Sequence, residues 1–458
     1  MIAFTDRLAE HCASREPVDA PGEALRKHVL DWFGVAIGGA AHADSTPALF
    51  EGTGDAGSGT ATVIPTGNRR PPGAAALVNG TLAHSLDFDD THLGSSLHPG
   101  APSIAAALAT AEATDAPTER FLTGVAVGYD VACTVGEAVN PDAHYARGFH
   151  VTATCGTFGA TAAAGVVHGL TEREFADAFG INGSQAAGSL QFLANGAWNK
   201  RLHPGLAARR AVTAVELAAA GFEGAAEPIE GEFGFLAGYT DEPRPERIDR
   251  LEGRNAVAET GLKPYPCCRY MHPAIDALRE LAPVVGPEAV TGIEVALPEA
   301  GVRLTGDPIG SKRRPENFVD CQFSMPFAAA LALSEGAAGA EPFLRAAGRL
   351  DDPPRFEDRG FRRLMDATDV TTDPEVQAAF PERWCARVVV EAGDRYERFV
   401  DVPRGEPSDP MAWEAVVEKA RGLIETAETG VDPDALARAV ERLPDRSVGE
   451  LVAVATGE

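Results

Sequence analysis

Residues 84–100 read His-Ser-Leu-Asp-Phe-Asp-Asp-Thr-His-Leu-Gly-Ser-Ser-Leu-His-Pro-Gly, and they concentrate acids and histidines within one short stretch. An apolar segment precedes the stretch, and an alanine-rich run beginning at Ile104 follows it. Titratable side chains between apolar segments cost free energy unless they are paired or used. These residues are therefore the first candidates for a functional site.

Local signals place His98 just before a helix. Pro99 and Gly100 break the chain, and Ser103 is expected to cap a helix from Ile104 to Ala113. The free N–H groups and the dipole of a helix N-terminus favour an anion. We therefore expect this position to suit a carboxylate substrate.

The residue types alone leave three interpretations of the stretch. The first is a loop of solvated acids and capping residues. The second is a metal site with histidine and aspartate ligands, although the spacing matches no standard ligand signature. The third is an acid–base site for a carboxylated substrate.

Composition limits the class of protein. A chain of 458 residues predicts two domains, because it exceeds the usual size of one core. The 40 basic and 67 acidic residues give a net charge of −27, which argues against nucleic acid or an anionic membrane as a partner. No apolar run approaches the roughly 20 residues of a membrane span, and the N-terminus carries no signal pattern. We expect a cytoplasmic protein.

The numbers and positions of lysine and cysteine are informative. Lysine occurs only at positions 27, 200, 263, 312 and 419, so the surface is predicted to be acidic and lysine-poor. Such a surface is typical of adaptation to high salt, although a GC-rich genome also favours arginine. The seven cysteines are odd in number and irregular in spacing, which indicates reduced thiols and neither a disulfide framework nor a four-cysteine cluster.

The order of residues 84–92, followed by His-Pro-Gly at 98–100, resembles the signature of the MmgE/PrpD family. This family includes 2-methylcitrate dehydratases, cis-aconitate decarboxylases and iminodisuccinate epimerases. Further segments that resemble the family occur along most of the chain, at residues 147–150, 199–205, 263–273, 321–327 and 404–410.

The resemblance and the local patterns agree on the fold class. They predict a mostly helical protein: a discontinuous helical domain at residues 1–266 and 405–458, and an inserted α+β cap domain at residues 267–404. Composition shifts near Lys263, and helix caps return after Pro410. A helix is predicted from Leu206 to Ala220, and strands are predicted at 291–297 and in a hairpin at 387–402. The resemblance also implies a homodimer.

The family's shared chemistry is removal of a proton next to a carboxylate, followed by loss of water, loss of CO₂ or reprotonation. It needs cations for the carboxylates and a base whose pKa lies near neutrality. His98 and His150 are each expected to precede a helix. A helix N-terminus lowers the pKa of a nearby histidine, which keeps the ring neutral and able to accept a proton. The resemblance implies catalytic roles for His98, His150, Asp87, Thr91 and Lys200.

The substrate is expected to bind Lys263, Arg269, Asp90 and His272, with the cations Lys263 and Arg269 holding its carboxylates. Arginine forks onto a carboxylate, and lysine supplies a point charge. The resemblance implies no cofactor and no metal.

The leading hypothesis is a hydro-lyase that eliminates water from a 2-methylcitrate-like tricarboxylate, in propionate catabolism. Alternatives within the family are epimerase and decarboxylase. Cys268 stands near the position where decarboxylases carry a catalytic histidine, which weighs against decarboxylation, and Phe327 or Met325 stands where other members use a tyrosine. An alternative of another class is a carboxylate-binding protein without turnover, but such a protein needs cations and not the two histidines.

Overall fold

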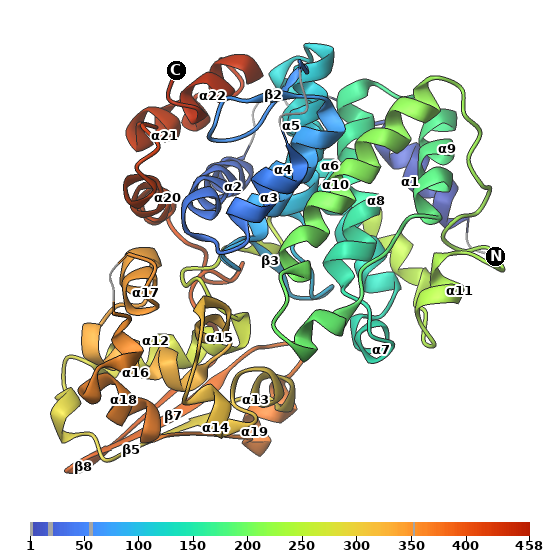
Figure 1. Cartoon of the computed structure of the whole chain (residues 1–458). Coiled ribbons are helices and arrows are strands. Elements are labelled where there is room, and N and C mark those ends of the chain that lie inside the picture. The colour runs from blue at the N-terminus through green and yellow to red at the C-terminus, as the bar shows by residue number, and fades with distance from the viewer. Residues whose placement is uncertain (1–2, 17–21, 55–57, 351–352) are drawn as a thin grey trace. The chain divides into compact units, whose positions relative to one another are not determined.

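The computed structural model describes residues 3–16, 22–54, 58–350 and 353–458. The chain forms one compact unit over Met1–Gly261 and Trp413–Glu458, which we call unit 1, and a second over Leu262–Ala412, unit 2. The sequence had placed these boundaries at residues 266 and 405. The predicted fold class, a discontinuous helical domain with an inserted α+β domain, is confirmed (Figure 1).

Unit 1 is built almost entirely from helices. Its helices and short strands are α1 (Phe4–Ala13), α2 (Glu23–His42), α3 (Thr46–Thr53), β1 (Ala61–Thr62), β2 (Arg69–Arg70), α4 (Pro72–His84), β3 (Thr91–His92), α5 (Gly100–Thr114), α6 (Thr118–Ala138), α7 (Pro141–Ala146), α8 (Val151–His168), α9 (Glu172–Gly183), η1 (Leu190–Ala194), α10 (Asn199–Ala219), α11 (Phe235–Tyr239), η2 (Pro245–Leu251), β4 (Thr260–Gly261), α20 (Trp413–Ala427), α21 (Pro433–Glu441) and α22 (Val448–Ala455). None of the described helices is long and apolar enough to cross a membrane.

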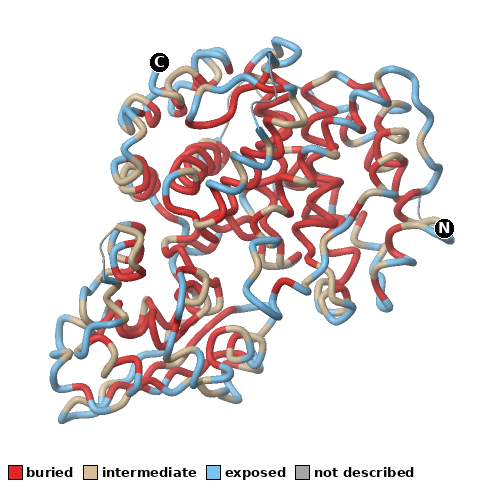
Figure 2. The backbone as a smooth tube through the Cα atoms, in the orientation of Figure 1, coloured by how far each residue is buried: buried red, intermediate tan, exposed pale blue. Residues whose placement is uncertain are grey.

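Small residues allow the central helices of unit 1 to lie close together. A Cβ built on Gly159 of α8 would lie 2.5 Å from the Cβ of Ala132 and 2.6 Å from the carbonyl oxygen of Gly128, both on α6. Such contacts leave no space for a side chain, so glycine and alanine set the spacing of these helices. Figure 2 shows the helices around this core as almost continuously buried, including most of α5 and α8.

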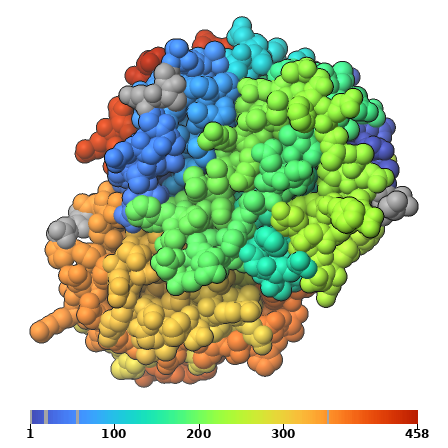
Figure 3. Space-filling model, turned by 45° about the vertical axis from the view of Figure 1, so that its right-hand side comes forward, coloured from blue at the N-terminus to red at the C-terminus, as the bar shows by residue number. Residues whose placement is uncertain are grey.

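The segment that contains α10 and α11 reaches the surface of unit 1, where its green and yellow-green atoms are seen in Figure 3. Two large apolar side chains are exposed just before α10: Leu193 at 52% and Trp198 at 44%. Sequence patterns predicted a helix only from Leu206, but α10 begins at Asn199 and contains Pro204. Lys200 and His203 therefore stand on a helix and not in a loop.

Unit 2 holds a four-stranded sheet covered by helices. The strands follow the order β6 (Thr368–Thr371), β5 (Gly292–Ala296), β7 (Ala386–Ala392) and β8 (Asp394–Val400). The β5–β6 pair is parallel, and the other two pairs are antiparallel. The remaining elements are η3 (Arg269–Met271), α12 (His272–Leu281), η4 (Pro287–Ala289), α13 (Glu299–Thr305), α14 (Ile309–Lys312), α15 (Phe318–Gln322), α16 (Met325–Glu335), α17 (Ala340–Ala346), η5 (Arg355–Glu357), α18 (Arg359–Asp366) and α19 (Pro374–Ala379).

The predicted hairpin and the predicted strand at 291–297 are both present, and Gly393, with φ of +79°, makes the hairpin turn. The strand β6 was missed. Its sequence, Thr-Asp-Val-Thr, is short and follows the helix α18 directly, so it offers no alternating pattern.

Candidate active site

A close helix crossing in unit 1 brings the first polar side chains together. A Cβ on Gly205 of α10 would lie 2.1 Å from the carbonyl oxygen of Leu77 on α4, and one on Gly80 would lie 3.0 Å from Gly205 Cα. His84 is the last residue of α4, one turn beyond Gly80, and His203 lies two residues before Gly205. The crossing of α4 and α10 therefore holds His84 and His203 next to one another.

Four buried histidines form what we call the histidine cluster: His84, His98, His150 and His203. The ring centroid of His84 lies 4.7 Å from that of His98 and 6.2 Å from that of His150. The ring centroids of His150 and His203 are 5.2 Å apart. The backbone N–H of His98 donates to Oγ1 of Thr152 at 3.1 Å, which ties this residue to the first turn of α8. The structure thus brings together both histidines that the sequence predicted to be catalytic.

Hydrogen bonds decide the tautomers of two rings. Nδ1 of His84 lies 2.7 Å from Oδ2 of Asp89, and Nδ1 of His98 lies 2.6 Å from the carbonyl oxygen of Asp90. A carbonyl or an ionised carboxylate only accepts, so both Nδ1 atoms donate. The remaining nitrogen, Nε2, is the proton-accepting atom of each neutral ring.

One hydrogen bond joins Nδ1 of His150 to Nδ1 of His203. Their Nδ1 atoms are 3.0 Å apart, so one must donate and the other accept. Burial, with the neighbouring rings and Lys200 adding positive charge, lowers the pKa of His150 well below its usual value. Burial lowers the pKa of His203 to about 4, with smaller contributions from His84, Arg210 and Lys200. Both rings are neutral at pH 7.

His150 stands at the N-cap of α8, as the sequence predicted. The pKa of His150 is shifted in the predicted direction, downward. Burial is the largest cause of that shift, whereas the prediction named the helix N-terminus.

Lys200 and Asp87 form an ion pair beside the cluster. Nζ of Lys200 lies 2.8 Å from Oδ1 of Asp87, and the two side chains are 20% and 7% exposed. Asp87 has a positive φ of 51°, a conformation that costs an ordinary residue strain. The resemblance implies a catalytic role for Asp87, and the structure pairs its carboxylate with Lys200.

Two further predicted residues flank His98. Oγ1 of Thr91 lies 3.4 Å from Nδ1 of His98. The carboxylate of Asp90 accepts from the hydroxyl of Tyr129 at 2.5 Å and from the backbone N–H of Gly100 at 3.2 Å. The side chain of Asp90 therefore anchors the start of α5, and its predicted role in binding substrate remains a prediction.

The other predicted binding residues lie in unit 2. Lys263 is buried. The guanidinium of Arg269 donates to Glu406, with Nε 2.8 Å from the carboxylate, and its Nη1 donates to Nδ1 of His272 at 2.7 Å. Because that ring accepts at Nδ1, its Nε2 donates to the carbonyl of Cys267 at 3.2 Å. Arg269 and His272 are thus held in a local network, and their contact with a substrate stays a prediction.

The departures from the family pattern have a packing explanation at one position. Phe327 is fully buried, with ring centroids 5.1 Å from Phe343 and 5.5 Å from Phe361. A phenol hydroxyl would be desolvated among these rings, so phenylalanine suits the position. Cys268 is also buried.

Sequence reasoning missed three members of the site: His84, Asp89 and His203. His203 follows Lys200 by three residues, so both lie on one face of α10. That signal was hidden because the helix was predicted to begin at Leu206. His84 and Asp89 lay within the quoted stretch, but only the fold shows that they contact each other.

Two sets of side chains have the composition of metal ligands. In the first, one atom each of His84, Asp89 and His98 lie within 4.8 Å of one another. Both histidines use Nδ1 as a hydrogen-bond donor, so only Nε2 is available to a metal on either ring. The expectation of metal-free chemistry stays a prediction.

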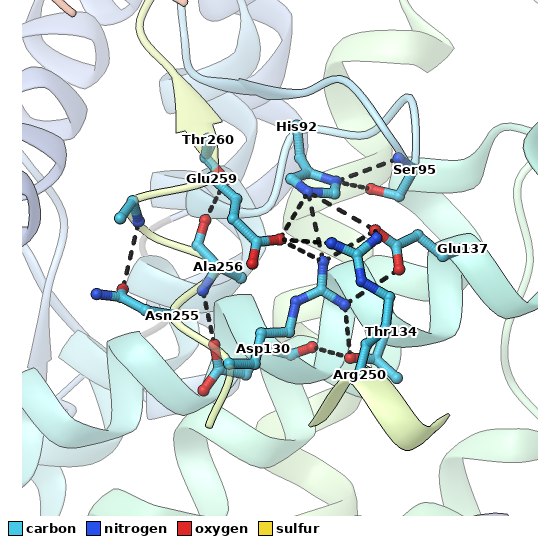
Figure 4. A network of polar contacts seen from close by, with 12 residues as sticks. His92, Ser95, Asp130, Thr134, Glu137, Arg250, Asn255, Ala256, Glu259 and Thr260 are labelled. Atoms are coloured by element: carbon cyan, nitrogen blue, oxygen red, sulfur yellow. Dashed lines mark hydrogen bonds and ion pairs between the residues drawn. The ribbon is translucent and has the colours of Figure 1, made fainter. Parts of the chain in front are cut away.

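The second set, His92, Glu137 and Glu259, belongs to an ion-pair network (Figure 4). Arg254 Nη2 lies 3.0 Å from Glu137 and 2.9 Å from Glu259, and Arg250 Nη1 lies 2.7 Å from Glu137. The hydrogen bond with His92, together with the charge of Arg254, lowers the pKa of Glu259 to about 2. The two arginines already neutralise both carboxylates, so we interpret the network as the support that fixes β3 and β4.

Comparison with known proteins covers nearly the whole chain. The model of the MmgE/PrpD N-terminal domain matches residues 5–248, and that of the MmgE/PrpD C-terminal domain matches residues 265–444. A cis-aconitate decarboxylase-like protein of Aspergillus oryzae is 26% identical over 99% of this chain and 97% of its own length.

Two mammalian relatives are also similar. The human cis-aconitate decarboxylase is 33% identical over 38% of this chain and 36% of its own length. The mouse cis-aconitate decarboxylase is 24% identical over 82% of this chain and 77% of its own length. With both family domains matched in order along the sequence, the chain belongs to the MmgE/PrpD family.

Proposed function

We propose that this protein is a cofactor-independent lyase that acts on a small di- or tricarboxylate, and that it eliminates water from a 2-methylcitrate-like substrate. The observation that carries the proposal is the histidine cluster, in which burial lowers the pKa of His150 and His203, beside the Lys200–Asp87 ion pair. A proton next to a carboxylate is weakly acidic, so its removal needs a nearby base and a cation that holds the substrate carboxylate in place. The cluster offers the first and Lys200 the second.

Each group has a definite part in this proposal. Lys200 binds a substrate carboxylate, and Asp87 fixes the position of the ammonium group. Nε2 of His98 accepts the proton, because its Nδ1 is committed to the carbonyl of Asp90. The neutral ring of His150 forms a hydrogen bond with the departing hydroxyl group.

Decarboxylation of a cis-aconitate-like acid is the second candidate, because the curated relatives named above are described as cis-aconitate decarboxylases or decarboxylase-like. Cys268 and Phe327 weigh against it, as they stand near positions where decarboxylases or other members carry acid–base side chains. Both candidates begin with the same bound carboxylates. They differ in the bond that breaks.

One experiment separates these reactions. The protein is incubated in D₂O with 2-methylcitrate, citrate, cis-aconitate and iminodisuccinate, and NMR follows deuterium exchange and products. Dehydration of 2-methylcitrate supports the proposal; release of CO₂ from cis-aconitate, or epimerisation of iminodisuccinate, replaces it with that reaction. If the acids bind without exchange or product, the binding-protein alternative holds.

Substitutions in the site test the roles. We expect His98→Ala and His150→Ala each to lower kcat by about 10²-fold or more. Lys200→Ala should mainly raise KM, because it binds carboxylate in the ground state and the transition state alike. His168→Ala, at the end of α8, is the matched control and should behave as the wild type. Near-normal kcat in both histidine variants would refute the assignment.

A further inference from the structure

Asp89 lies between two imidazole rings of the histidine cluster. Its Oδ2 is 2.7 Å from Nδ1 of His84 and 3.6 Å from Nδ1 of His98. The side chain of Asp89 is 3% exposed, that of His84 is fully buried, and that of His98 is 11% exposed. Water screens a charge weakly in such a place, so Asp89 acts strongly on both rings.

We propose that Asp89, oriented by His84, is the buried counter-charge that allows His98 to take the substrate's proton. Asp89 and His84 are then positioning residues that act through His98. The inference rests on the proposed function, in which His98 is the base. It goes beyond that function because neither Asp89 nor His84 was assigned a role.

The proton step shows why a counter-charge is needed. The C–H bond next to the substrate carboxylate breaks, and its electron pair stays on the substrate and spreads into that carboxylate. The proton bonds to Nε2 of His98, and the ring becomes positively charged 3.6 Å from Asp89. The proton later passes to the departing hydroxide or to solvent, which restores the neutral ring.

His84 is suited to orient Asp89 and not to replace His98. Its Nδ1–H donates to the carboxylate, which fixes the carboxylate's rotamer. Its Nε2 is buried and has no hydrogen-bond partner among the described residues. A substrate therefore reaches the more exposed ring of His98 first. Two imidazolium rings 4.7 Å apart would also repel each other, so the cluster favours one added proton over two.

Three variants test the inference by kinetics. In His84→Asn the side-chain amide reproduces the Nδ1–H donor but lacks Nε2. We expect His84→Ala and Asp89→Asn to lower kcat by about 10²-fold with KM changed less than about threefold, and His84→Asn to recover at least about tenfold over His84→Ala. If His84→Asn is as inactive as His84→Ala, Nε2 of His84 is itself required and the inference is wrong.

A matched control addresses the loss of any buried carboxylate. Asp130 on α6 is also buried, 3.4 Å from Nε2 of His11 and 2.9 Å from Arg15. Asp130→Asn makes the same chemical change at another aspartate–histidine contact. Its kcat should stay within about threefold of the wild type. An equal loss of kcat in Asp130→Asn and Asp89→Asn would overturn the inference.

A second measurement does not depend on turnover. ¹⁵N NMR of the histidine rings reports the pH at which His98 takes up a proton. The other titratable groups that face it, His84 and His150, are still present in Asp89→Asn, and the same spectra follow their rings separately. We expect the midpoint in this variant to move to lower pH by about one pH unit, because an opposite charge is lost. An unmoved midpoint refutes the inference, whereas a moved midpoint without turnover of any tested acid refutes only the proposed function.

Discussion

The pair of rings at His150 and His203 makes the stability of the folded chain depend on pH. In the folded state burial holds the pKa of His203 at about 4, whereas the ordinary value is 6.5. Between these two values the unfolded chain binds a proton that the folded chain does not. The stabilisation is therefore complete above about pH 6.5 and is lost as the pH falls toward 4.

We predict that His203→Asn weakens this dependence. Urea titrations measure the free energy of unfolding at about pH 7 and at about pH 4.5. The decrease from the higher to the lower pH should be about 2 kcal/mol smaller in the variant than in the wild type. Asp31, whose pKa burial raises to about 6, contributes the opposite slope in both proteins and cancels in the difference. His168→Asn is the control and should keep the wild-type slope. Equal slopes for His203→Asn and the wild type would contradict the prediction.

Single residues also show why part of the site was predictable. The order of His98, His150 and Lys200 along the chain carries the family motifs, so no fold was needed to select them. Their partners are different. The contact between His150 and His203 depends on where α10 begins and on the space at Gly205, neither of which appears in a motif.

At the scale of elements, the predicted start of α5 was wrong for an identifiable reason. Ser103 was expected as the N-cap, but it is fully buried inside α5, which begins at Gly100. Pro102 falls in the first turn, where a missing N–H costs nothing. Gly100 is required because a Cβ there would lie 2.3 Å from the hydroxyl of Tyr129. A Pro-Gly pair predicts a break, and tertiary contacts turned it into a helix start.

Helix α20, from the C-terminal segment, supports the loop of the candidate site. It crosses α2 closely, since a Cβ on Gly34 would lie 2.9 Å from Ala420 Cα. The crossing buries Lys419, whose Nζ lies 2.5 Å from Asp31 and 2.7 Å from the carbonyl oxygen of Phe88. Nζ of Lys419 also lies 3.9 Å from the centroid of the Phe88 ring. Phe88 stands between Asp87 and Asp89, so this lysine fixes the backbone that carries both carboxylates.

We predict that Lys419→Met destabilises the chain by about 3 kcal/mol and lowers kcat, because it leaves Asp31 without its cation and the Phe88 carbonyl without a donor. Urea unfolding and steady-state kinetics measure both effects. Lys419→Met combined with Asp31→Asn should lose less free energy of unfolding than the sum of the single variants. Lys27→Met is the control, because Lys27 pairs at i,i+4 with Glu23, whose side chain is 67% exposed, and its loss should leave stability almost unchanged. Additive single effects would show that the ion pair carries no coupling.

At the scale of the whole molecule, charge is the dominant property. The 67 acidic residues exceed the 40 basic ones by 27. Ion pairs do not reduce this excess, because every basic residue is already counted against an acidic one. Partly exposed pairs are nevertheless present, as on unit 2, where Arg387 Nη1 lies 2.9 Å from Glu397. Such pairs contribute about 0–1 kcal/mol each, so screening them costs little. The uncompensated negative charge repels itself over longer distances and destabilises each compact unit.

We therefore predict that added salt stabilises the protein. Raising KCl shortens the Debye length from about 10 Å at 0.1 M to about 3 Å at 1 M, which screens the repulsion more than it weakens close contacts. The melting temperature, followed by circular dichroism, should rise steadily between low and molar KCl, and activity should rise with it. An uncharged osmolyte at equal osmolality is the control for general exclusion effects and should raise the melting temperature less. A melting temperature that is unchanged or lower in molar KCl would show that self-repulsion does not limit stability, and the high-salt interpretation of the acidic, lysine-poor composition would then be wrong.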